Sequence, residues 1–132
     1  MANVIVSGGD SRIKAAAGNT VTAGTMLKWS SNTLVPATDG TACAGIALNS
    51  ATTGENVVAI VGDGTTIVRL NAASGFDPNV GDKLYIAGAS TVDGGSSTNL
   101  CCGICLTNAS EAGVLEFVLW TPDSTGQYFP HA

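Results

Sequence analysis

The sequence of 132 residues has few charges, few aromatic side chains and a single histidine. Only 11% of the residues are charged, and ten Asp and Glu against five Lys and Arg leave a net charge of −5. Because nucleic-acid-binding proteins normally cluster cations on one face, this balance argues against a nucleic-acid partner. The histidine, His131, is the penultimate residue, so we expect no catalytic residues and no enzymatic activity.

Long hydrophobic runs are also missing. No stretch approaches the roughly 18 apolar residues of a membrane-spanning helix, and the N-terminal segment lacks the cationic start and apolar run of a signal peptide. We therefore expect a soluble protein that is made in the host cytoplasm and has no membrane partner. The 45% hydrophobic content excludes intrinsic disorder, because it offers enough apolar surface to offset the entropy of ordering the chain.

Four cysteines are present, and three of them form a C-x-x-C pattern within Cys101–Cys105. This pattern is typical of a redox pair or half of a metal site. Residues 100–106 are expected to form a strand, where Cys102 and Cys105 would point to opposite faces. A zinc site also needs four ligands, and only Cys43 and the terminal histidine remain. We therefore expect reduced, buried cysteines that pack as small hydrophobes, with no metal and no cofactor.

Short apolar runs alternate with turn clusters along most of the chain. Many short strands at close spacing, joined by Asp-Gly and Gly-Gly turns, indicate an all-β fold, either a small β-barrel or a sandwich. Residues 13–17 are long enough for only one helical turn. The expected turns include Asp39-Gly40, Asp63-Gly64, Ala73-Ser74-Gly75 and Asp93-Gly94-Gly95.

An internal repeat is the most informative feature of the sequence. One copy spans about residues 21–61 and the other about residues 79–119, and each is too small to bury a core alone. We therefore expect the two copies to pack together and close one small barrel. The matched positions are Gly24 with Gly81, Leu27 with Leu84, Gly45 with Gly103, Ile46 with Ile104, Leu48 with Leu106 and Ala51 with Ala109.

This pattern divides the chain into three parts: an N-terminal arm over residues 1–12, a β-barrel domain over 13–120 and a C-terminal tail over 121–132. The arm either adds to the sheet edge of a neighbouring molecule or pairs within its own domain. The aromatic residues near the C-terminus are candidate interface anchors, although a floppy tail is the alternative. The candidate partner-binding residues are Val4, Ile5, Val6, Arg12, Trp120, Tyr128 and Phe129.

Other segments that suggest chemistry have simpler explanations. Gly62–Thr66 lacks the Gly-Lys-Ser/Thr of a phosphate loop and is expected to be a hairpin turn at Asp63-Gly64. Glu55 and Glu111 precede the last strand of each copy and are expected in solvated turns. Glu116 alternates with apolar neighbours, so we expect it on the exposed face of its strand.

The repeated segments resemble those of a known protein family over roughly residues 20–119. The resembling segments are Val21–Leu27, Gly45–Glu55, Val57–Gly62, Val80–Tyr85 and Gly103–Val118. Their pattern is similar to that of the capsid decoration (cement) proteins of tailed bacteriophages. The chain departs from the family pattern in the cysteines of the second Gly-Ile-x-Leu strand, which the family does not require, and in residues 121–132, which lie outside the resemblance.

The resemblance implies a small β-barrel on the exterior of a phage capsid. It further implies a virion protein, commonly a homotrimer, that binds between subunits of the major capsid protein and stabilises the head against internal DNA pressure. An alternative is a carbohydrate- or receptor-binding module of a tail fibre or surface appendage. That function requires an aromatic platform, for which Trp29 and Tyr85 are the only candidates in the body of the domain. A small hydrolase is the third possibility.

Overall fold

The computed structural model describes residues 5–8, 11–39, 41–94, 101–109 and 113–121. All regular structure in these residues is β, as the sequence predicts. The strands are β1 (Ile5–Ser7), β2 (Arg12–Ala16), β3 (Met26–Ser30), β4 (Thr33–Pro36), β5 (Gly45–Ala47), β6 (Asn56–Ile60), β7 (Asp63–Ala72), β8 (Lys83–Gly88), β9 (Thr91–Asp93), β10 (Gly103–Cys105) and β11 (Val114–Trp120).

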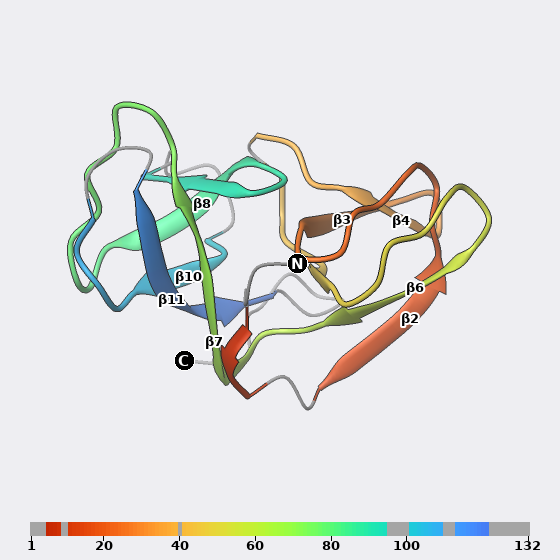
Figure 1. Cartoon of the computed structure of the whole chain (residues 1–132), viewed down its shortest axis with the longest axis horizontal. Helices are drawn as coiled ribbons and strands as arrows, with labels where there is room; N and C mark the ends of the chain where they lie inside the picture. The colour runs from red at the N-terminus through yellow and green to blue at the C-terminus, as the bar shows by residue number, and fades with distance from the viewer. Residues whose placement is uncertain (1–4, 9–10, 40, 95–100, 110–112, 122–132) are drawn as a thin grey trace.

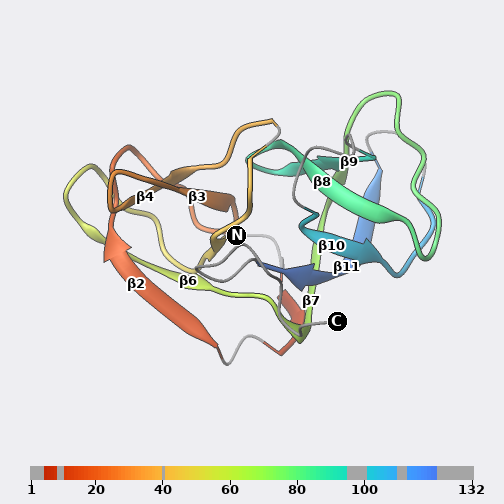
Figure 2. The same cartoon turned by 180° about the vertical axis from the view of Figure 1, so that it is seen from behind.

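The strands form two sheets, and each sheet closes on itself. The first runs in the order β2-β6-β5-β3-β4, and a parallel bridge between Ala17 and Leu34 joins its two edges. The second runs β1-β7-β11-β10-β8-β9, and β9 pairs in parallel with β7 to close the ring. We call strands β2–β6 barrel one and strands β7–β11 barrel two. The two barrels lie side by side in Figures 1 and 2, with β1 added to β7.

The two barrels have the same topology. Their strands follow each other along the chain and pair in the same order, including the parallel contact between the first and third strand of each copy. The backbone hydrogen bonds repeat as well: the Gly24 N–H donates to the Ala47 carbonyl at 2.8 Å, and the Gly81 N–H donates to the Cys105 carbonyl at 2.9 Å. Both glycines have a left-handed φ, of +89° and +92°, which favours residues without a Cβ.

Side-chain hydrogen bonds at matched positions repeat in the same way. In barrel one the Val58 N–H donates to Asn49 Oδ1 at 2.8 Å, and in barrel two the Glu116 N–H donates to Thr107 Oγ1 at 2.9 Å. The internal repeat predicted from sequence is therefore present in the backbone pairing and in individual hydrogen bonds.

The closure of the barrels differs from the expectation. Each copy closes its own barrel, whereas the sequence suggested that both copies would close one. The matched windows contain four strands each, and the fifth comes from β2 or β7, which precede the windows. These two strands take equivalent places through backbone pairing: the Ala17 N–H donates to the Glu55 carbonyl at 2.7 Å, and the Ala72 N–H donates to the Gly113 carbonyl at 2.8 Å. Their segments 12–18 and 69–75 are also alike in sequence, with Arg, Ala-Ala and Gly at the same spacing, so the repeat begins earlier than expected.

Two local expectations are also corrected. Asp63-Gly64 lies in the first residues of β7, where a hairpin turn was expected, because β6 and β7 belong to different barrels. The chain crosses between barrels just before, at Gly62, where a Cβ would meet the Leu119 carbonyl and the Trp120 Cα. Residues 12–16 form strand β2, paired with β6, in place of a helical turn.

The apolar residues form two cores. The core of barrel one is built mainly from alanine and valine. The second core fills barrel two and also includes residues from the outside of barrel one, among them Met26, Ile46 and Ile60. The Met26 N–H donates to the Ala89 carbonyl in the β8–β9 connection at 2.7 Å. The second core therefore joins the two barrels.

Candidate functional site

The described residues of the N-terminal arm include strand β1, which pairs antiparallel with β7 of the same chain. Ile5 lies opposite Val68 and packs against the core of barrel two. Val6 keeps 41% of its surface exposed and is free to contact a partner. The arm thus pairs within its own chain in this structure. Val4 lies outside the described residues.

The other candidate partner-binding residues are separated in the fold. Trp120 is the last residue of β11, half-buried and opposite Asp63 at the start of β7. Arg12 opens β2 in barrel one and is exposed. The structure places Val6 and Trp120 on strands that pair with β7, while Arg12 pairs with β6. Tyr128 and Phe129 lie outside the described residues.

The four cysteines are free and buried, so the predicted packing role is confirmed. Cys43, Cys102 and Cys105 belong to one core, which corrects the expectation that Cys102 and Cys105 face opposite sides. The reason is that Cys102 precedes strand β10, where the regular alternation of faces does not apply. Among the described residues, no group of three or more His, Cys, Asp or Glu side chains is placed to hold a metal.

The environment of the cysteines suppresses ionisation. Burial raises the pKa of the Cys43 thiol to about 12 from an ordinary value of 9.0. Burial, followed by the nearby Cys43 and Cys101 thiols, raises the pKa of Cys102 well above that value. Since a thiolate is the reactive form, these side chains are unreactive in the folded protein.

The stability of the protein is expected to decrease above pH 9 because of Cys43. The unfolded chain releases the thiol proton near pH 9, whereas the folded chain holds it until about pH 12, so stability is full below pH 9 and falls as the pH rises. Between about pH 8 and about pH 10.5, the wild type should lose on the order of 2 kcal/mol more than the Cys43→Ala variant. Urea unfolding of both proteins under reducing conditions measures this. An equal loss in the two proteins would contradict it.

The described carboxylates at the candidate acid–base positions have structural partners. Glu55 lies in the turn before β6, and its Oε1 accepts hydrogen bonds from the Thr52 N–H at 2.8 Å and Oγ1 at 2.9 Å. These bonds lower the pKa of Glu55. Glu116 pairs with Arg69 at 2.7 Å on the outside of barrel two. Both positions agree with the sequence prediction, and Glu111 lies outside the described residues.

Besides Val6, four large apolar side chains of the described residues are exposed, and of these only Trp29 was considered as a binding residue from the sequence, as part of an aromatic platform for the carbohydrate-binding alternative. Each retains more than a third of its surface in contact with solvent. Single exposed apolar residues are common on protein surfaces, so exposure alone does not make Val80 or Val114 a contact position. The repeat gave no signal for the four exposed residues: Leu48 packs against the core and its match Leu106 is exposed, although both are leucine. These residues are Trp29 at 53%, Val80 at 62%, Leu106 at 38% and Val114 at 56%.

Comparison with known proteins gives a match in structure but not in sequence. Neither a family model nor a curated protein sequence matches the chain. The fold is similar to the crystal structure of the head fiber gp8.5 N base of bacteriophage phi29, with a TM-score of 0.55. The two share 17% sequence identity, and the match covers 82% of this chain and 92% of the other. At this identity the likeness shows a common fold. None of the described residues belongs to a helix long and apolar enough to cross a membrane.

Proposed function

We propose that this protein is a structural component of a tailed-phage virion, bound to the capsid exterior as a decoration protein. The main support is the fold that it shares with the head fiber base of phi29, a protein named for its place on a phage head. The sequence resemblance to cement proteins over residues 20–119 points in the same direction independently. In this proposal the protein acts by binding and not by catalysis, and its buried thiols and partnered carboxylates serve the fold.

The proposed partner is the major capsid protein, contacted at the junctions between its subunits. A homotrimer would contact several capsid subunits at once, so modest individual contacts combine through effective concentration into slow dissociation. Each stable contact would need to bury about 1,000 Å² or more. Val6 on β1 and Trp120 on β11 are candidate contact residues, because both lie at the surface along β7.

The proposal is tested by mixing the purified protein with emptied, expanded heads of the phage whose genome encodes it. We expect the protein to co-sediment with the heads up to a fixed number of copies per particle. Unexpanded heads are the control, since the subunit junctions differ before expansion. Binding to a glycan array without binding to heads would favour the carbohydrate-binding alternative, and would overturn the capsid proposal.

A further inference from the structure

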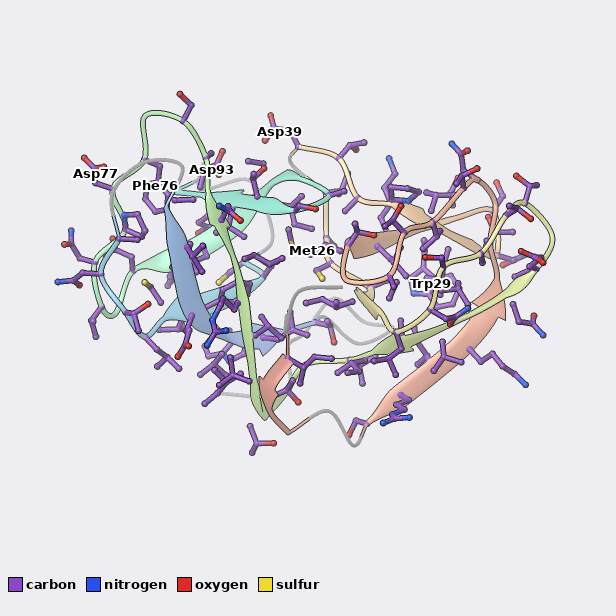
Figure 3. All side chains as sticks on the ribbon, viewed as in Figure 1. Met26, Trp29, Asp39, Phe76, Asp77 and Asp93 are labelled. Atoms are coloured by element: carbon purple, nitrogen blue, oxygen red, sulfur yellow. The ribbon has the colours of Figure 1, made fainter. Side chains whose placement is uncertain are left out.

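One face of barrel one is used to hold the two barrels together. Met26, Ile46 and Ile60 form a row across neighbouring strands β3, β5 and β6. All three are at most 1% exposed, and they belong to the core of barrel two. Figure 3 shows Met26 between the barrels, where its N–H reaches Ala89. This row is therefore the surface through which barrel one contacts barrel two.

Barrel two carries the equivalent row, and no barrel covers it. Lys83, Ile104 and Val118 pair across β8, β10 and β11 as Met26 and its neighbours pair in barrel one. Ile104 and Val118 are only half-buried, and Lys83 is exposed. Leu106, directly after the end of β10, is 38% exposed. We call Lys83, Ile104, Leu106 and Val118 the outer row.

The surface of barrel two that contacts barrel one also has an equivalent in barrel one. Barrel two meets barrel one at the end that carries the β8–β9 connection, which points toward barrel one in Figures 1 and 2. There Ile86 lies opposite Val92 and is fully buried. Trp29 holds the matching position in barrel one, opposite Leu34, and is 53% exposed. In Figure 3 Trp29 lies on barrel one, farther from barrel two than Met26.

We propose that a second copy of this chain docks the Trp29 end of its barrel one on the outer row of barrel two. Within the chain, the β8–β9 end of barrel two already packs on the matching row of barrel one. Each molecule therefore keeps one unused surface of each kind: the Trp29 end of barrel one and the outer row of barrel two. An interface between two different surfaces is heterologous, and it forms a closed ring when its rotation allows. The proposal deepens the self-association within the proposed function by naming the surfaces, and it requires no capsid.

Complementary variants test this arrangement by sedimentation velocity of the full chain without heads. Trp29→Glu removes one surface and Ile104→Glu removes the other, and each is expected to weaken self-association at least tenfold. An equimolar mixture should form a dimer and no larger species, because one intact Trp29 end meets one intact outer row. Val114→Glu, an exposed residue of β11 separated from Val118 by Glu116, is the matched control and should assemble as wild type.

Three outcomes would overturn the docking proposal. They are a monomeric wild type, variants that assemble as wild type, and a mixture that stays monomeric although each variant is folded by circular dichroism. Leu106→Glu replaces Ile104→Glu if the latter fails to fold, since Leu106 is already 38% exposed. Heads distinguish the two proposals. A folded wild-type monomer that still binds heads would contradict the docking surfaces alone, whereas an assembled protein that binds no heads would contradict the capsid function alone.

Discussion

Replacing Phe117 with alanine is expected to lower the free energy of unfolding by about 3–5 kcal/mol. Phe117 lies on the inner face of β11 and is completely buried in the core of barrel two. Its strand pairs it with Cys105 on one side and Val68 on the other, so neighbouring backbones hold the walls of the resulting cavity in place. Because the same core contains residues of barrel one, the loss of stability should affect both barrels.

Urea unfolding followed by circular dichroism measures this effect. Val114→Ala is the matched control, because Val114 is in the same strand but 56% exposed, and it should change stability by less than about 0.5 kcal/mol. A Phe117→Ala variant within about 1 kcal/mol of wild type would show that barrel two does not have the packed interior described above.

Gly103→Ala is the second substitution with a large expected effect, about 3 kcal/mol. A Cβ at this position would meet the Val118 carbonyl and the Phe117 ring. Strand β10 is paired on both sides, with β8 and β11, so the backbone cannot move away without breaking hydrogen bonds. Gly45, the match of Gly103 in barrel one, is similarly crowded by the Ile60 carbonyl. Close approach of neighbouring strands therefore explains why both copies have glycine here.

Gly75→Ala separates this steric effect from that of backbone conformation. Gly75 has a φ of +81° and nothing within 4 Å of its added Cβ, so only the cost of a left-handed alanine applies, about 1 kcal/mol. Chemical unfolding of the two variants should therefore rank Gly103→Ala as clearly the less stable. The reverse order would mean that β10 does not pack against β11 as closely as the structure has it.

The sequence predicted the all-β class and the repeat because both depend on local patterns. Gly45-Ile46 and Gly103-Ile104 each need a glycine at the crossing with the next strand, and this leaves a visible motif. Strands β2 and β7 also left a signal that the predicted repeat did not include, because segments 12–18 and 69–75 share Arg, Ala-Ala and Gly at the same spacing. Their places in the two barrels could not be predicted from it, because they depend on backbone hydrogen bonds, which nearly any extended segment can make.

The candidate surfaces were harder to predict than the fold. Ile46 and Ile104 share a motif and a place in their strands, yet only Ile46 is fully buried, because a barrel lies in front of it. Local sequence therefore does not reveal which of two matched faces is covered. The burial of the cysteines was predictable, because the repeat aligns Cys102 and Cys105 with two small residues, Ala44 and Ala47.

Imaging of expanded phage heads with and without the purified protein tests whether it decorates the capsid. We expect added density on the outer surface of the shell, at junctions between capsid subunits and large enough for paired barrels. The density should be absent from heads that lack the protein and should return when the protein is added back. Heads that stay undecorated at saturating protein concentration would show that the protein is not a capsid decoration protein.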